Sequence, residues 1–475
     1  MTSTLPNSVP DTSTSRSTEA PLVLDLRAPP PRPLSFLDQA SLWCSLGVSL
    51  LIPASALFVL YPVVDAPGMT IAAAMTAIVL GSLAGSALLG LCAAPGARTG
   101  APAMALLRGL LGRRTSYLPT VLNLLQCFGW AALEIYVIAE TATRLTSSSW
   151  RTTWVIAAGL VATLMAVRPL KAVKLVRKYL IWLVLLATVY LFWGVLRDGV
   201  TTPDGGDWSG FWVAFDVVIA LPISWAPLAA DYSRHSRTSR AAFSGAFFGY
   251  AASCITYFTL GLLAVLAVAG AGDAFTPTAF VGALLAVPAG ALALVVLAVD
   301  EVDEAFANIY STAMSTQNLI PRLDRRVLAV LIGVAATVAA LLVNLESYQS
   351  FLFLIGAVFV PLAVTLIVDF YVVRRITLGA SGAGYDVVAP GRLRWLMVLP
   401  WVAGFSAYNL INPGLVDWWA QRWISLRDAL GFVPPTWLSA SVFSGVVAAI
   451  LTLAVGIPLA RTLRTTLMPE STMTT

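Results

Sequence analysis

The sequence predicts an all-α protein that crosses a membrane about twelve times. Of its 475 residues, 58% are hydrophobic and only 11% are charged, whereas soluble domains carry about 25% charged residues. The charges lie in short stretches between apolar runs of roughly 20 residues, the length that a helix needs to cross about 30 Å of hydrocarbon. Glycine and proline interrupt the first and the sixth run. These observations predict a polytopic membrane protein in which two helices are broken.

The expected spans follow the apolar runs. They lie at roughly residues 40–63, 68–94, 117–143, 153–167, 179–197, 209–230, 245–270, 289–318, 327–343, 347–373, 394–411 and 436–462. The eighth span is ambiguous. Hydropathy alone favours 278–299 as the crossing, and this choice would leave Asp300, Glu301, Asp303 and Glu304 as a solvated cap at its inner end.

Arginine and lysine predict the orientation of the chain. With the N-terminus inside, 24 of the 29 basic residues fall in inner segments, and five fall outside: Arg144, Arg151, Arg197, Arg422 and Arg427. Because basic residues are enriched in cytoplasmic loops, we expect a multi-pass protein of the plasma (cell inner) membrane with both termini in the cytoplasm.

The two ends of the chain differ from the rest in composition. Residues 1–35 are rich in Ser, Thr and Pro and contain no apolar stretch, so we expect a disordered cytoplasmic tail and no cleaved signal peptide. One membrane domain at 36–462 and a short cytoplasmic tail at 463–475 complete the expected organisation.

The sequence offers little reactive chemistry. All four cysteines fall inside expected spans without paired spacing, so disulfides are not expected. The single histidine, His235, lies in a basic inner loop, and no phosphate loop, haem ligand pair or metal spacing is visible. The net charge of +5 is not gathered into a patch typical of nucleic-acid binding. We therefore expect neither an enzyme nor a cofactor, and no obligate protein partner.

The interrupted spans point to a site inside the membrane. Span one contains Gly47 and Pro53, and span six contains Pro222 and Pro227. Proline removes a helix hydrogen bond, and paired interruptions at equivalent places in two halves are the sequence sign of a central binding site. An ordinary proline kink explains each interruption equally well.

Span three carries a polar stripe. Asn123, Gln126, Trp130 and Glu134 are spaced to lie on one helical face. A carboxylate near the bilayer centre costs about 2.5 to 3.5 kcal/mol, so Glu134 must face protein or water. It either binds a ligand or fixes helix packing through a hydrogen bond.

Two tryptophans lie at membrane depth, away from the interfacial belts where most such residues are found. Trp130 is at the middle of span three, and Trp225 is in the broken part of span six. Two indoles can enclose a planar ring by offset stacking. Core packing is the alternative interpretation.

Span eight carries a second polar face. Asp300, Glu304, Asn308 and Ser311 step by four, four and three residues, and Asp303 lies beside them. If the span is 289–318, these carboxylates lie near the middle of the membrane and can bind a cation or the ligand.

Several segments together resemble the nucleobase and cation symporter family of cytosine, purine, hydantoin and hydroxymethylpyrimidine permeases. They cover about residues 34–411 and read LSFLDQASLWCSLGVSLL, TGAPAMALLRGLLGRRTSYLPTVLN, QCFGWAALE, SWAPLAADYSR, ANIYSTAMSTQN and SYQSFLFLIGAVFVPLAVTLIVDFY. The resemblance implies a LeuT-type fold of two inverted five-helix repeats, here about 40–197 and 209–373, plus extra helices at about 394–462. It also implies that the eighth span is 289–318 and that 276–286 is an extracellular helix.

The resemblance implies roles for individual residues. Trp130 and Trp225 match the two tryptophans that enclose the substrate ring. Glu134 and Asn308 match polar residues that contact it, and Ser224 matches a position of backbone contact. Gln126 lies on the same face of span three as Glu134 and completes the expected substrate-binding set.

The same resemblance addresses the coupling ion. In sodium-coupled members the ion lies between carbonyls of the broken first helix, here near Gly47 and Leu50, and two hydroxyl residues of the eighth. This chain has Val302 and Asp303 at those two positions. Asp303, with Glu304 beside it, can therefore ligate Na⁺ or carry a proton, and the resemblance leaves both open with a slight preference for the proton.

The expected function is import of a small aromatic nitrogen heterocycle in symport with a cation. A carboxyl at Glu134 suits a ring nitrogen beside an exocyclic amine. QCFGWAALE together with SYQSFLFLIGAVFVPL resembles the CytX-type branch, which implies hydroxymethylpyrimidine, the thiamin precursor. Cytosine, purines and hydantoin or allantoin are alternatives within the family. A channel or a non-transporting receptor is the alternative from another class.

Overall fold

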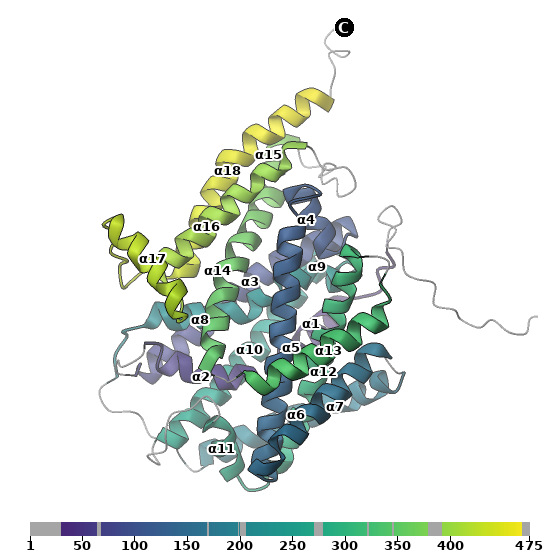
Figure 1. Cartoon of the computed structure of the whole chain (residues 1–475), viewed down its shortest axis with the longest axis vertical. Helices are drawn as coiled ribbons and strands as arrows, with labels where there is room; N and C mark the ends of the chain where they lie inside the picture. Colours follow the sequence, from purple (N-terminus) through teal and green to yellow (C-terminus); the bar gives the residue numbers. More distant parts are fainter. Residues whose placement is uncertain are drawn as a thin grey trace, which may run out of the picture.

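The structure is a computed structural model, and it describes residues 30–63, 68–168, 171–197, 199, 206–269, 279–320, 323–343, 346–378 and 392–467. Most of residues 1–35 and 463–475, the two expected tails, lie outside this description. The described part is helical (Figure 1). Its first-half helices are α1 (Phe36–Ser45), α2 (Leu51–Leu60), α3 (Ile71–Thr99), α4 (Ala103–Leu111), α5 (Tyr117–Leu145), α6 (Arg151–Val167) and α7 (Lys171–Arg197).

The remaining helices continue the bundle. They are α8 (Phe211–Ser224), α9 (Ala229–Ser233), α10 (Ser239–Ala269), α11 (Ala279–Ala286), α12 (Gly290–Leu319), α13 (Arg325–Leu342), α14 (Glu346–Val368), α15 (Arg374–Leu378), α16 (Val398–Ile411), α17 (Asp417–Ala429) and α18 (Ala440–Leu467). Short 3-10 turns lie at Ser148–Trp150, Ala226–Leu228 and Arg392–Met397, and a π-helical turn at Asp369–Val373 joins α14 to α15.

Nine of the described helical segments are long and apolar enough to cross a membrane. The three remaining expected spans fall short of that standard for different reasons. Span one is divided into α1 and α2, span eight carries the acidic run, and span eleven corresponds to the short α16. The ambiguous eighth span forms one helix, Gly290–Leu319, so its carboxylates lie within the helix, and the separate helix α11 precedes it.

The first span breaks between Ser45 and Leu51. At Gly47 the backbone passes so close to α10 that an added Cβ would lie 2.0 Å from Ser253 Oγ. Pro53 lies in the first turn of α2, where helix N–H groups have no partner within the helix and a missing N–H costs little. The glycine therefore marks the break, and the proline begins the second half.

The sixth span is also divided. Helix α8 ends at Ser224, a 3-10 turn containing Pro227 follows, and α9 continues to Ser233. Trp225 lies between the two helical parts, so its indole is presented where the backbone changes direction.

Equivalent helices of the two halves pack against each other, as the inverted repeat requires: α3 against α10, α5 against α12 and α6 against α13. The α6–α13 contact is reciprocal. A Cβ at Gly159 would lie 2.0 Å from Thr337 Oγ1, and a Cβ at Gly333 would lie 2.0 Å from Thr163 Oγ1. Each threonine hydroxyl donates to the carbonyl of the glycine four residues earlier on its own helix.

The helices beyond the repeats lie along α14. Helices α16 and α18 pack against α14 and against each other (Figure 1). At the start of α18, the buried Asp216 of α8 accepts hydrogen bonds from Ser439 Oγ at 2.6 Å and from the N–H groups of Ala440 and Ser441 at 2.8 and 3.0 Å. A carboxylate of the core thus caps an added helix.

A buried ionic network joins three elements at the other end of α14. Asp369 accepts from Arg394 at 2.6 Å and from Arg374 at 3.0 Å, and both arginines also donate to the Gly109 carbonyl of α4. Both the Asp369 and the Arg394 side chains are buried. The network holds α4, the end of α14 and the segment before α16 together.

Residues 30–35, which we expected to belong to the disordered tail, pack against the loop after α9. Leu34 N–H donates to the His235 carbonyl, and Arg237 N–H donates to the Leu34 carbonyl. His235 Nδ1 lies 3.0 Å from the Pro31 carbonyl. His235 is therefore a loop residue that contacts the segment leading into α1.

Candidate functional site

The two broken helices meet α5 and α12 around a small central cavity. All six residues that the sequence analysis assigned to substrate binding line this cavity: Gln126, Trp130, Glu134, Ser224, Trp225 and Asn308. The full lining is Leu46, Ser49, Leu51, Ile52, Gln126, Cys127, Trp130, Glu134, Leu221, Ser224, Trp225, Leu228, Tyr250, Glu304 and Asn308. Residues up to 262 positions apart in the sequence are thus brought to one place.

Gln126 ties α5 to the end of α8. Its Nε2 donates to the Ser224 carbonyl at 2.8 Å and to Asn123 Oδ1 at 2.9 Å. The Ser224 hydroxyl is itself satisfied, because it donates to the Leu221 carbonyl at 2.6 Å. Gln126 Oε1 is buried and has no hydrogen-bond partner, so an acceptor remains free at the cavity.

Glu134 lies one turn further along α5 from Trp130 and faces α12. Its Oε1 accepts from Asn308 Nδ2 at 2.8 Å, while Oε2 is buried without a partner. Asn308 Nδ2 also approaches the Glu304 carbonyl at 3.3 Å. The hydrogen bond between Glu134 and Asn308 orients the carboxyl group and leaves one oxygen for a ligand.

The two tryptophans occupy different aromatic surroundings. Trp130 makes edge contacts with Tyr348 and Phe351, with ring centroids 5.9 and 5.2 Å away, and its Nε1 has no partner. Trp225 packs edge-on against Trp43 and Tyr232, at 6.3 and 6.4 Å. Each indole is fixed by neighbours and also borders the cavity.

The expected cation-coupling residues lie at the helix break and on α12. Gly47 and Leu50 are in the interruption between α1 and α2, Asp303 is half-buried, and Glu304 lines the cavity. The described residues contain no group of three or more His, Cys, Asp or Glu side chains that is arranged to hold a metal ion.

A carboxylate that we did not single out contacts the break directly. Glu301 is 1% exposed, and its oxygens accept from Leu50 N–H at 2.6 Å and from the Ser49 hydroxyl at 2.9 Å. Glu301 lies three residues before Glu304 and seven before Asn308, so it shares their face of α12, although the stripe of Asp300, Glu304, Asn308 and Ser311 did not include it. The available signal was the break itself, since the N–H groups that begin α2 need an acceptor.

Negative side chains accumulate here without a basic counterpart. Glu134, Glu301 and Glu304 are buried, and within the described part of the chain none forms an ion pair with Lys, Arg or His. Burying several ionised carboxylates without a counterion is strongly unfavourable. The site therefore needs protons, a metal cation or a cationic ligand to be neutral.

The cavity is small. Its volume is about 30 Å³, roughly the share of one water molecule in the liquid. An aromatic ring requires the surrounding side chains to move apart, so this arrangement is a closed one.

A sequence model described as "Permease for cytosine/purines, uracil, thiamine, allantoin" matches residues 49–382. The Bacillus subtilis (strain 168) protein YxlA, which bears the name purine-cytosine permease, is 24% identical over 355 residues that cover 71% of this chain and 77% of its own length.

Two solved structures of the transporter Mhp1 share the fold. Its inward-facing conformation superposes with a TM-score of 0.66 at 17% identity, covering 93% of this chain and 96% of Mhp1. A closed conformation, described as that of a nucleobase-cation-symport-1 family transporter with bromovinylhydantoin bound, gives 0.64 at 16% identity, covering 95% and 98%. These likenesses confirm the predicted fold of two inverted repeats with extra helices.

Proposed function

Since the chain belongs to the family of permeases for cytosine and purines, uracil, thiamine and allantoin, we propose that it imports a small aromatic nitrogen heterocycle by symport with a cation. Membership in this family makes it a multi-pass membrane transporter and not an enzyme. The observation that carries the proposal is a row of buried polar atoms without partners on one face of α5, at the cavity that the two broken helices also line.

These atoms favour a particular ligand edge. Glu134 Oε2 and Gln126 Oε1 are free acceptors, and Trp130 Nε1 is a free donor. A heterocycle with an exocyclic amine and a neighbouring ring nitrogen presents both a donor and an acceptor, so it can satisfy atoms that are costly to leave unpaired. An aminopyrimidine fits this set better than an imide, which presents two carbonyl acceptors beside its N–H.

We take hydroxymethylpyrimidine as the best candidate substrate. It is an aminopyrimidine, which agrees with the carboxyl group of Glu134 and with the resemblance to the CytX-type branch. Cytosine or a purine is the alternative that keeps the same edge chemistry. Hydantoin or allantoin would be expected if an amide acted in place of that carboxyl.

The buried carboxylates support coupling to a cation. Glu134, Glu301 and Glu304 require neutralisation, and Gly47, Leu50, Asp303 and Glu304 remain our candidates for contact with the coupling ion, which is Na⁺ or H⁺. In the proposed cycle, heterocycle and cation bind from outside while the cavity is open. The cavity closes around them and then opens to the cytoplasm across the plasma membrane. The fluxes are coupled if the two bound species stabilise the same conformation.

The test is uptake of labelled hydroxymethylpyrimidine into vesicles that contain the purified chain. Sodium and proton gradients are imposed separately, and unlabelled cytosine, adenine and hydantoin are added as competitors. Concentrative, saturable uptake that is blocked by aminopyrimidines supports the proposal, and the effective gradient identifies the ion. Non-saturating flux without accumulation would indicate a channel, and binding without uptake would indicate a receptor.

Matched variants assign the uptake to the central cavity. Trp130→Ala should reduce ligand affinity by about tenfold or more, because it removes a ring face and a hydrogen-bond donor. Trp193→Ala, which changes an exposed tryptophan on α7, is its control and should leave uptake unchanged. Asp303→Asn should change the ion or pH dependence more than the affinity for the heterocycle.

A further inference from the structure

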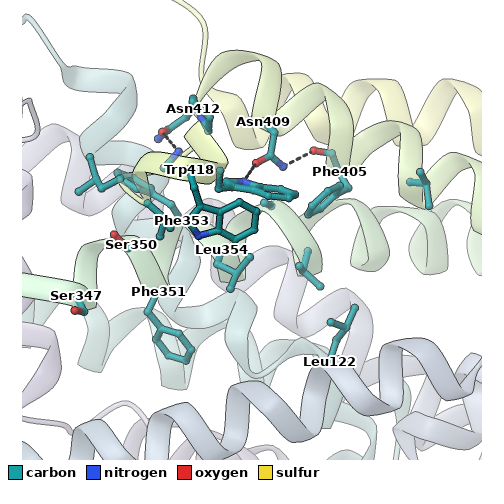
Figure 2. A pocket seen from close by; sticks show the side chains of 18 of the residues that line it. Leu122, Ser347, Ser350, Phe351, Phe353, Leu354, Phe405, Asn409, Asn412 and Trp418 are labelled. Atoms are coloured by element: carbon teal, nitrogen blue, oxygen red, sulfur yellow. Dashed lines mark hydrogen bonds between the residues drawn. The ribbon is translucent and has the colours of Figure 1, made fainter. Parts of the chain in front are cut away.

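A much larger apolar groove lies behind the central cavity. This lateral groove is bordered by α5, α14, α16 and residues 412–419, which lead from α16 into α17, and its volume is about 610 Å³. In Figure 2, Trp418 and Asn409 lie on the side of α16 and α17, and Leu122 lies across from them on α5. The groove is outside the substrate site, and the two share no lining residue.

The lateral groove opens toward the surface that a bilayer covers. Leu118, Leu354 and Val402 line it and remain 48%, 53% and 48% exposed. Helices α5 and α14 are both long and apolar enough to span a membrane. Water gains few hydrogen bonds in such a space, so hydrocarbon is the medium available to fill it.

Size and rim chemistry identify the occupant. The groove volume of about 610 Å³ is roughly twenty times the share of about 30 Å³ that one water molecule takes in the liquid, so the groove has room for a fatty-acyl chain. At the rim, Trp418 is 65% exposed, and the guanidinium of Arg422 lies 6.0 Å from its ring centroid. Helix α17 has no buried residue. An apolar groove that ends at an indole and a cation matches an acyl tail joined to a phosphate.

We propose that the lateral groove holds one acyl chain of a membrane phospholipid, with the headgroup phosphate beside Arg422. The acyl chain of this lipid would contact Phe351 on the side that faces away from Trp130. Phe351 lines the groove, and its ring contacts the ring of Trp130 at 5.2 Å. On α5 a Cβ at Gly129 would lie 2.7 Å from the Phe351 ring, so the ring lies directly against the helix that carries Glu134. The lipid therefore touches the outer side of a wall of the substrate site.

The experiment uses the full chain in phosphatidylcholine vesicles that contain a fraction of phosphatidylcholine with a photoreactive diazirine in its acyl tail. After illumination, labelled peptides are identified by mass spectrometry, and labelling of α14, α16 and residues 412–419 is normalised to that of α13. Leu354→Trp places a larger side chain in the groove and occupies part of it. Leu331→Trp is the control, because it makes the same change on α13, at a side chain that is 60% exposed and outside the groove.

We expect groove peptides to be labelled well above α13 in the wild-type chain. Each buried methylene is worth about fourfold in affinity, so blocking several of them with Leu354→Trp should lower groove labelling by about tenfold or more. Leu331→Trp should leave it unchanged. Val402→Trp occupies part of the groove from the opposite wall and provides the same test if Leu354→Trp does not fold.

Three results would overturn the proposal. Equal labelling of groove and α13 peptides would mean that bulk lipid alone contacts the surface. Labelling that is insensitive to both Leu354→Trp and Val402→Trp would place the lipid elsewhere. Groove labelling that disappears as the ratio of protein to lipid in the vesicles is raised, while α13 labelling stays, would assign the groove to a second chain. None of these readouts depends on uptake, so they are independent of the proposed substrate.

Discussion

Replacing Glu301 tests whether the broken first helix depends on a carboxylate from α12. Glu301→Ala removes the acceptor of the Leu50 N–H and of the Ser49 hydroxyl. Glu301→Gln removes the same charge but keeps an amide oxygen for Leu50, and its NH₂ can donate to Ser49 Oγ, since a hydroxyl can reverse its role. Both variants lose any cost of burying the charge, so their difference comes from the hydrogen bonds and from the buried side-chain atoms that alanine lacks.

The magnitude follows from those contacts. A hydrogen bond contributes about 1 kcal/mol to stability, and a buried donor left without an acceptor costs about 1 to 3 kcal/mol. Glu301→Ala loses two bonds and leaves the Leu50 N–H unpaired, so we expect it to be about 2 to 4 kcal/mol less stable than Glu301→Gln. Leu292→Ala, at a 69% exposed position on the same helix, should change stability by less than about 0.5 kcal/mol.

The cysteines provide the assay. Cys92, Cys127 and Cys254 are free and buried, so a thiol-reactive fluorophore labels them as the purified protein unfolds on heating. The labelling midpoint should be lowest for Glu301→Ala, intermediate for Glu301→Gln and closest to wild type for Leu292→Ala. Equal midpoints for the two Glu301 variants would show that the break does not need an acceptor from α12, and the reasoning would fail.

Three further predictions use the same thermal assay. Arg394→Met removes one of two arginines from Asp369 while Arg374 still compensates the charge, so it should cost about 1 to 3 kcal/mol, and restoration of the midpoint by the double variant with Asp369→Asn would confirm the pairing. Asp216→Ala removes the cap of α18 and should cost about 2 kcal/mol; hydrogen exchange should rise first at residues 440–444, and unchanged exchange there would contradict the capping role. Gly333→Leu inserts a side chain against α6 and should cost about 1 to 3 kcal/mol or more, whereas Leu331→Ala on the same helix should be neutral.

The residues that line the central cavity were predictable because their pattern is local. Gln126, Trp130 and Glu134 follow helical spacing on one span, and Asn308 follows it on another. A polar stripe on an apolar helix must face other protein or water. The stripes on spans three and eight and the interruptions in spans one and six were therefore enough to predict that these four spans meet at one cavity. The size of the cavity was not predictable, since it depends on how far the helices approach each other.

Glu301, Asp216 and Asp369 were not predicted, because each acts on a helix end or a charge far away in the sequence. Asp216 caps a helix that begins 224 residues later, and Glu301 meets an amide 251 residues earlier. Neither pairing leaves a periodic signal within one span. Asp369 lies in a π-helical turn, and such turns have no simple sequence signature.

The reciprocal contact of α6 with α13 restricts where this protein can move. Gly159 faces Thr337 and Gly333 faces Thr163, and neither position has room for a Cβ, so a movement that brought any larger residue to either place would be opposed at both contacts. We expect α6 and α13 to keep a fixed position relative to each other. Opening of the central cavity must then be taken up by the interrupted helices and their neighbours, and a spin-label distance between α6 and α13 should stay constant while distances to α2 and α9 change with ligand.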